Sequence, residues 1–232
     1  MIRIKILYDN NLKERRFISA WGFSCFIEEK KILFDTGGQS SVLFHNMKEL
    51  KVPFENIEHI FISHIHGDHT GSLIPLVKKI KKVKVWIPEN FPEELKIELG
   101  TYGARIKNIK GATKLFENVY STGIMGKYPP EQSLLIDTKR GIILIVGCSH
   151  PGILNIATKA KNILNKKIHL ILGGLHLRGY PRAHLFHIIS LLKNETERIA
   201  PCHCTGEDAT EIIKEVWKEG FIEVAVGTSI EC

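Results

Sequence analysis

Hydrophobic and polar positions follow two patterns along the chain. Alternation and short apolar runs indicate strands, and helical spacing indicates helices. Residues 2–7 alternate with period two, which predicts a half-buried strand. Short apolar runs of strand length predict further strands at 22–27, 31–34, 59–62, 83–87, 134–137, 142–146, 168–172, 198–201 and 222–226. Helical spacing and start signals predict helices at 40–50, 70–80, 92–99, 151–164, 183–192 and 208–217. No linker interrupts this pattern, so we expect one α/β domain over residues 1–232, with its elements arranged in layers.

Composition places the chain among globular proteins. Its 232 residues are 44% hydrophobic and 25% charged, which excludes disordered and fibrous classes. No apolar run approaches the roughly 18 residues that a membrane helix needs. The first residues already belong to a predicted strand, so we expect no signal peptide and a cytoplasmic protein. Five cysteines, an odd number, agree with free thiols in a reducing compartment.

The chain carries a formal net charge of +7, which favours acidic partners. Those partners could be nucleic acid or a small phosphorylated molecule. The basic residues are spread along the chain, so a solvated basic surface is the alternative explanation. The charge alone therefore assigns no partner.

One histidine-rich segment, residues 63–71, carries most of the chemical information. His64 and His66 are two positions apart, so in extended chain they point the same way and can share a metal ion. Asp68 and His69 fall at the turn into the next helix, where they can face a second ion. Imidazoles with a carboxylate suit zinc, manganese, iron or cobalt. A surface histidine cluster is the alternative, and the position directly after a buried strand disfavours it.

Three later histidines occupy similar places. His150, His176 and His203 each follow a predicted strand, stand beside glycine or proline and precede a helix. In open α/β sheets this edge is where ligand sites are built. We therefore expect His150 and His203 to bind metal. For His176 two roles stay open, metal ligand or substrate contact.

The motif His-x-His-x-Asp-His at residues 64–69, with Asp-Thr-Gly at 35–37, resembles the metallo-β-lactamase superfamily over almost the whole chain. Segments 120–123, 147–152, 173–177 and 201–206 further resemble one branch, the dihydropterin–ribofuranosylaminobenzene phosphate synthases of methanopterin biosynthesis. The resemblance implies a four-layer αββα sandwich with a two-metal cleft at one edge of its sheets. In that branch the expected reaction joins a pterin pyrophosphate to a ribosyl-aminobenzene phosphate.

The resemblance also implies a ligand set. The first ion would be held by His64, His66 and His150, and the second by Asp68, His69 and His203. Asp35 would orient these ligands from behind, although a simple turn aspartate is the alternative. Most hydrolases of the superfamily have a bridging aspartate at a strand end, and no Gly-Asp pair stands at the comparable place here. His176 or Cys148 is the candidate for that position.

Other polar groups near these segments have less certain roles. We expect Cys148, Cys202 and Cys204, which flank ligands, to behave as small buried hydrophobic residues. Cys202 and Cys204 stand on either side of His203, so in extended chain they would point away from it. Arg178 and Lys127 could bind a substrate phosphate, with a solvated surface position as the alternative. The glycine- and proline-rich segment 123–130 could close over a ligand as a lid.

Together these features predict a metal-dependent hydrolase or transferase acting on a small phosphorylated, pterin-like substrate. Bound metal, most simply zinc and otherwise manganese or iron, would lower the pKa of water, which Asp68 would orient. A metal-dependent nuclease or phosphodiesterase is one alternative, although 232 residues leave little room for an added nucleic-acid-binding arm. A non-catalytic metal- or ligand-binding protein is the other.

Overall fold

The computed structural model describes residues 1–80 and 82–232, which form two compact units. The first unit contains Met1–Ile109 and Val224–Cys232, and the second contains Lys110–Glu223. Each unit has one mixed β-sheet with helices, so the predicted α/β class is confirmed. Among the described residues no helix is both long enough and apolar enough to cross a membrane.

The first unit is built on a seven-stranded sheet in the order β13-β1-β2-β3-β4-β5-β6. The pairs from β13 to β3 are antiparallel, and those from β3 to β6 are parallel. The inner parallel strands β3 and β4 are fully buried, as expected where both faces of a sheet are covered, whereas the edge strand β6 is mostly exposed. The strands of this sheet are β1 (Arg3–Tyr8), β2 (Ser24–Ile27), β3 (Ile32–Phe34), β4 (His59–Phe61), β5 (Lys84–Pro88), β6 (Arg105–Ile109) and β13 (Ser229–Glu231).

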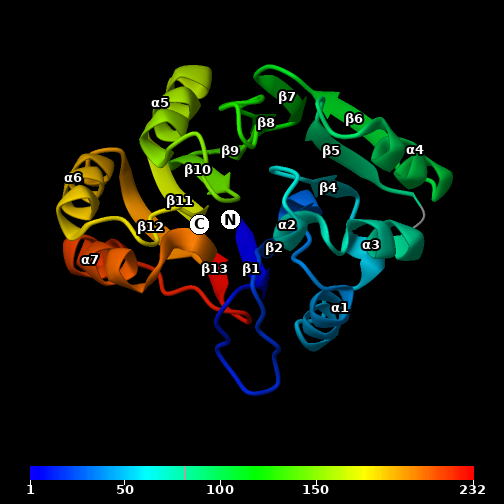
Figure 1. The fold of residues 1–232 in the computed structure, drawn as a ribbon, viewed down its shortest axis with the longest axis horizontal. Helices are drawn as coiled ribbons and strands as arrows, with labels where there is room; N and C mark the ends of the chain where they lie inside the picture. Colours follow the sequence, from blue (N-terminus) through cyan, green and yellow to red (C-terminus); the bar gives the residue numbers. More distant parts are fainter. Residues whose placement is uncertain (81) are drawn as a thin grey trace. The chain divides into compact units, whose positions relative to one another are not determined.

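Helices pack on this sheet (Figure 1), and their buried apolar residues form one cluster with those of the strands. Leu43 of α1 and Leu76 of α3 join the same buried cluster as Ile60 of β4. The predicted helix 70–80 begins later, at Leu73, and Thr70 is the last residue of a separate short helix. In the turn between these helices, a Cβ at Gly71 would lie 2.2 Å from the Gly38 carbonyl oxygen. The helices are α1 (Ser40–Glu49), α2 (Gly67–Thr70), α3 (Leu73–Ile80) and α4 (Glu93–Thr101), with short 3-10 turns η1 (Glu28–Lys30) and η2 (Phe54–Asn56).

The second unit is built on a six-stranded sheet in the order β12-β11-β10-β9-β8-β7. Strands β10, β11 and β12 are parallel neighbours, and the remaining pairs are antiparallel. The carboxyl ends of the three parallel strands therefore meet at one edge. The bounds are β7 (Thr113–Phe116), β8 (Val119–Ser121), β9 (Leu134–Thr138), β10 (Gly141–Val146), β11 (Ile168–Gly174) and β12 (Thr196–Cys202).

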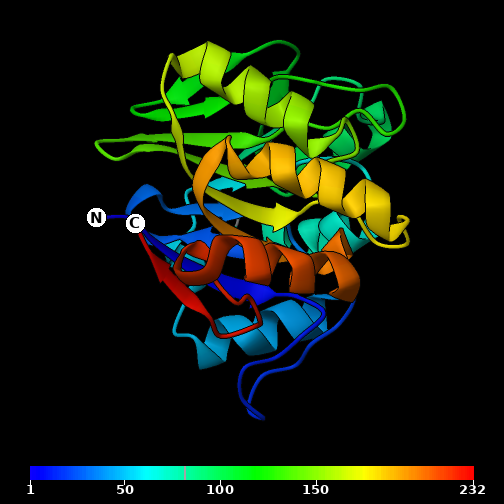
Figure 2. The same cartoon turned by 90° about the vertical axis from the view of Figure 1, so that its left-hand side faces the viewer.

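A helix follows each parallel strand of this unit, and Figure 2 shows the three helices side by side. Leu185 and Ile189 of α6 lie in one apolar cluster with residues of α5, α7 and the sheet. The helices are α5 (Ile153–Leu164), α6 (Arg182–Lys193) and α7 (Glu207–Trp217), with 3-10 turns η3 (His203–Thr205) and η4 (Lys218–Gly220).

Two further predicted elements differ from the structure. Helix α5 begins at Ile153 and not at Pro151, because Gly152 precedes it with a φ of +88° that no helix contains. Residues 222–226 do not form the predicted closing strand. The chain passes there from the second unit to the first, and Val226 makes only an isolated bridge to Leu12. The closing strand is β13.

Candidate metal centre

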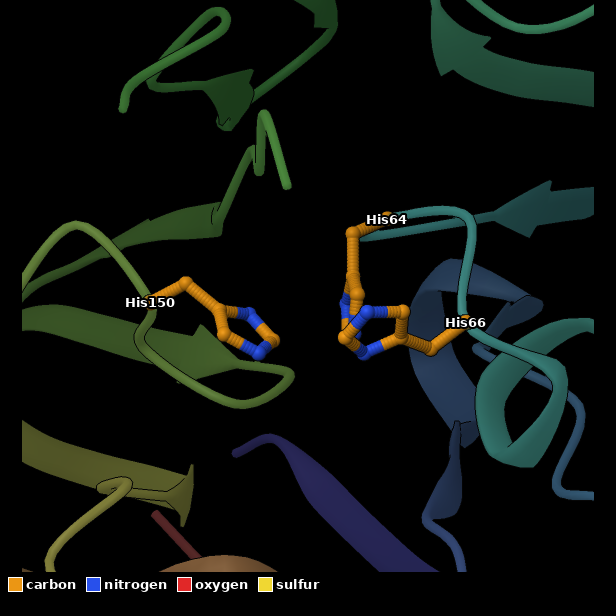
Figure 3. A group of neighbouring side chains, drawn as sticks. All are labelled: His64, His66 and His150. Atoms are coloured by element: carbon orange, nitrogen blue, oxygen red, sulfur yellow. The ribbon is translucent and has the colours of Figure 1, made fainter. Parts of the chain in front are cut away.

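The histidine-rich loop lies directly after β4 in the first unit. His64 and His69 are buried, His66 is exposed and Asp68 is half-buried. The ring centroid of His64 lies 4.7 Å from that of His66 and 4.3 Å from that of His69. Figure 3 shows the His64 and His66 rings next to each other on this loop. The loop therefore gathers three imidazoles on its own.

Asp35 lies buried behind this loop, at the end of β3, and accepts three hydrogen bonds. They come from the Ser63 backbone N–H, the Ser63 hydroxyl and Nδ1 of His69, each at 2.7 Å. Ser63 Oγ in turn lies 2.9 Å from Nδ1 of His64. Since the hydroxyl donates to Asp35, His64 Nδ1 donates to the hydroxyl. Both histidines then carry their proton on Nδ1 and direct the lone pair of Nε2 outward, as a metal ligand must.

Asp68 lies in the first turn of α2. Its Oδ2 is 3.7 Å from Nε2 of His69, which is too long for a hydrogen bond and suits two atoms that share an ion. The backbone carbonyl of Asp68 closes against Gly22, where a Cβ would meet that oxygen at 2.4 Å. Glycine at this position, with a φ of +141°, lets the loop approach β2 closely.

The second unit brings five potential ligands to the carboxyl ends of β10, β11 and β12. The donor atoms of Cys148, His150 and His176 lie within 4.8 Å of one another, and so do those of Cys148, His203 and Cys204. The His150 and His176 ring centroids are 4.6 Å apart. Figure 3 shows His150 on the loop after β10. The three strand ends meet as the sequence predicts, and the cysteines join them.

Hydrogen bonds connect the three loops that carry these residues. Ser149 Oγ donates to the Gly174 carbonyl at 2.7 Å, and the Leu175 N–H donates to Thr205 Oγ1 at 3.1 Å. Ser149, His176 and His203 all have positive φ values, of 63°, 53° and 52°. Such conformations are costly for residues other than glycine and cluster at functional sites. The loops are therefore held in a fixed, strained arrangement.

Glu131 supports the ligand loop after β10, and sequence analysis missed it. Its Oε1 accepts from the N–H groups of Cys148 and Ser149, at 3.0 and 2.9 Å. Its Oε2 accepts from the N–H and from Nδ1 of His150, both at 2.9 Å. The carboxylate is fully buried and fixes His150 with Nε2 outward. The one signal in the sequence is an acidic residue placed just before an apolar strand.

The cysteines differ in part from expectation. Cys148, Cys202 and Cys204 are buried as predicted, yet Cys148 and Cys204 lie among the imidazoles. A hydrogen bond from Cys148 lowers the pKa of Cys204 to about 4, helped by a second bond from His176 and opposed by burial. The Cys204–His176 bond also raises the pKa of His176. Residues 203–205 form η3, so the extended geometry that would turn Cys204 away from His203 is absent.

Arg178 and Lys127 are exposed residues of the second unit. Arg178 packs on the start of α7, where a Cβ at Gly206 would meet its Cα at 2.9 Å. Lys127 lies in a short hairpin whose ends, Met125 and Glu131, exchange backbone hydrogen bonds of 2.8 and 2.9 Å. This hairpin occupies the segment predicted as a lid.

Comparisons with known proteins decide the family. The profile described as the Metallo-beta-lactamase superfamily matches residues 21–187. The chain belongs to the metallo-β-lactamase superfamily. The match includes the histidine-rich loop, His150 and His176, whereas His203 lies beyond it.

Three proteins are similar to this chain over almost its whole length. The chain is 27% identical to the 7,8-dihydropterin-6-methyl-4-(β-D-ribofuranosyl)-aminobenzene-5′-phosphate synthase of Methanocaldococcus jannaschii, over 93% of this chain and 91% of that protein. An uncharacterized protein of the same organism, MJ0448, is 29% identical over 98% and 99% of the two chains. The crystal structure of Tm1679, a metal-dependent hydrolase of the β-lactamase superfamily, is 27% identical, with a TM-score of 0.86 over 100% and 99% of the chains. The predicted resemblance to superfamily and branch is confirmed.

Proposed function

We propose that this chain is a metal-dependent enzyme that acts on a small phosphorylated substrate. One repeated arrangement carries the proposal. In each unit a buried carboxylate accepts from Nδ1 of a histidine, Asp35 from His69 and Glu131 from His150. Histidines that bind metals have such carboxylate partners, which fix the tautomer and the ring orientation. One residue of each pair follows a strand, since Asp35 comes directly after β3 and His150 lies in the loop after β10.

The donor set fits a divalent transition metal. Imidazoles with thiol and carboxylate groups favour zinc, with iron or manganese as alternatives. The residues that would hold metal are His64, His66, Asp68 and His69 in the first unit, and His150, His176 and His203 in the second. When bound, a metal ion lowers the pKa of water toward ~7 and polarises phosphoryl oxygens. The half-buried Asp68 carboxylate would accept a hydrogen bond from that water and orient it.

The substrate class follows from the relatives and from charge. The name of the M. jannaschii relative describes a product that joins a dihydropterin to a 5′-phosphate. The net charge of +7 attracts such anions. We assign the phosphate contacts to Arg178 and Lys127, both exposed in the second unit. The reaction is then either condensation of a pterin pyrophosphate with a ribosyl-aminobenzene phosphate or hydrolysis of a phosphate ester.

Elemental analysis followed by a substrate screen tests this proposal. Purified protein should contain at least one tightly held transition metal per chain, and His66→Ala should lower that content. His45→Ala is the matched control, because His45 lies on α1 and its Nε2 bonds to the Arg16 carbonyl. The metal-loaded enzyme should release pyrophosphate from a dihydropterin pyrophosphate, or phosphate from a small ester.

Three outcomes would contradict the proposal. Full metal retention in His66→Ala would show that the histidine-rich motif does not bind the metal. Turnover of oligonucleotides or of bis(p-nitrophenyl) phosphate, with none of small phosphorylated heterocycles, would favour a nuclease or phosphodiesterase. Metal binding without any turnover would favour a binding protein.

A further inference from the structure

We propose that the second unit holds metal through cysteine thiolates as well as imidazoles, with Cys148 as the shared ligand and Cys204 as its partner. The inference rests on the proposed metal dependence and adds a class of ligand to it. From the sequence, Cys148 was one of two candidates for the bridging position, whereas Cys204 was expected only to be a small buried hydrophobic residue. Three features of the second unit support the assignment.

The first feature is spacing. Cys148 Sγ belongs to two groups of donor atoms, one with His150 and His176 and one with His203 and Cys204. Within each group all donor atoms lie within 4.8 Å of one another. Donors of one tetrahedral zinc ion are about 3.6 Å apart, from Zn–N bonds of about 2.1 Å and Zn–S bonds of about 2.3 Å. Small movements of the side chains would therefore bring each group around one ion, and Cys148 Sγ is common to both groups.

The second feature is a space kept open for sulfur. A Cβ at Gly174, the last residue of β11, would lie 2.6 Å from Cys204 Sγ and 2.6 Å from the Gly147 carbonyl oxygen. Real Cβ atoms do not approach other atoms so closely, so any side chain at this position would displace the thiol. Gly174 has no side chain, and the Cys204 sulfur occupies the space next to it.

The third feature is the surroundings of the thiols. Cys148 and Cys204 are buried, with exposed fractions of 4% and 6%. Glu131 fixes the backbone of Cys148 through its N–H group. The sulfur of Cys148 lies near the donor nitrogens of His150, His176 and His203, and the sulfur of Cys204 lies near that of His203. Both thiols are therefore buried beside other potential metal ligands.

Thiolate ligands reduce the number of metal ions that fit the site. Thiolates prefer zinc, cobalt(II) and iron, whereas manganese and magnesium prefer oxygen ligands. A site with Cys148 and Cys204 should discriminate against manganese more strongly than imidazoles and carboxylates alone would. The inference therefore selects zinc or iron from the metals left open by the sequence.

Cobalt spectroscopy on the full chain tests the inference. Metal-stripped protein is titrated with Co²⁺, and thiolate coordination should give an intense sulfur-to-cobalt charge-transfer band in the near ultraviolet. Cys148→Ser should abolish the band, and Cys204→Ser should weaken it. Cys202→Ser is the matched control and should leave it intact. Cys202 flanks the same histidine and, among the described residues, belongs to none of the ligand groups.

Alkylation of the unmodified chain gives a second measurement that needs no variant to fold. Zinc should protect Cys148 and Cys204 from iodoacetamide at least tenfold, as read by peptide mass spectrometry, and should leave Cys232 unchanged. Stoichiometric Co²⁺ binding without a charge-transfer band, or without protection of Cys148, would overturn the inference and leave the proposed function standing. Failure of the chain to bind any transition metal would overturn both.

Discussion

His150 Nδ1 lies 2.9 Å from Oε2 of Glu131, and the other oxygen of this carboxylate holds the N–H groups of Cys148 and Ser149. A single buried side chain therefore sets both the shape of the ligand loop and the tautomer of its histidine. Four donors surround the carboxylate, so an amide in its place would turn an NH₂ group toward another N–H. The consequence for metal binding can be measured directly.

We predict that Glu131→Gln weakens metal binding by about 10- to 100-fold, the usual effect of removing a carboxylate behind a ligating histidine. A competition titration against a chromophoric chelator measures the change. Glu197→Gln is the matched control, because Glu197 Oε2 lies 2.9 Å from Nδ1 of His169, which is in none of the ligand groups among the described residues. Equal affinities of the two variants would refute a supporting role for Glu131.

Asp35→Asn should weaken metal binding of the first unit by a similar ~10- to 100-fold. It should also lower the free energy of unfolding by about 1–3 kcal/mol, because buried donors on Ser63 and His69 lose their shared acceptor. Ser63→Ala removes only the hydroxyl that joins Asp35 to His64, so its effect should be smaller. Chelator competition and urea unfolding measure the two effects, and an unchanged Asp35→Asn protein would contradict the prediction.

Metal stoichiometry tests the ligand pairing that the resemblance implies. If His66 and His150 hold the same ion, each alanine variant loses one ion per chain and the double variant loses no more. Combining His66→Ala with His203→Ala should remove both ions, because the resemblance assigns His66 to the first ion and His203 to the second. Elemental analysis of the four proteins decides, and additive losses for His66 and His150 would refute the pairing.

Gly174→Ala should destabilise the second unit by about 1–3 kcal/mol, the usual cost of overpacking. The new methyl group would collide with Cys204 Sγ and with the rigid Gly147 carbonyl, each at 2.6 Å. Gly111→Ala in the same unit should have little effect, since a Cβ there meets nothing within 4 Å. Urea unfolding of both variants, with metal present and absent, compares them. A Gly174→Ala protein as stable as the control would show that the thiol can move away freely.

The salt dependence of binding separates a small substrate from a polymer. A ligand with one or two phosphates releases few counterions, so its affinity should fall only shallowly with salt. A nucleic acid that contacts many lysines would show a steep slope. Equilibrium binding of a phosphorylated pterin and of an oligonucleotide across a salt series provides the comparison. Tight oligonucleotide binding with a steep slope, and none of the pterin, would reject the small-molecule substrate.

Much of the fold followed from local patterns. Apolar runs predicted β4, β10 and β11 within a few residues, because strands buried on both faces are nearly continuous in hydrophobicity. The breaks were harder to predict. Helix α2 ends and α3 begins around Gly71, which lies against the distant backbone of Gly38. No local pattern carries such information.

The candidate site divides in the same way. The histidine-rich loop could be predicted because its ligand types are adjacent in sequence. The role of Glu131 could not be predicted, because it precedes His150 by nineteen positions and strands β9 and β10 lie between them. Cys204 was assigned to the core because an extended chain was assumed around His203, whose φ is +52°. A single backbone angle therefore reversed the expected direction of a side chain.

The hairpin from Met125 to Glu131 ends on the residue that holds His150. The backbone of Glu131 closes the hairpin, and its carboxylate binds the ligand loop after β10. An ordered hairpin therefore favours an ordered ligand loop. Thermodynamic reciprocity then applies: a substrate that tightens the hairpin raises the affinity for metal by the factor by which metal raises the affinity for that substrate. Metal retention and substrate selection would thus be two measurements of one coupling energy, with Glu131 as its physical carrier.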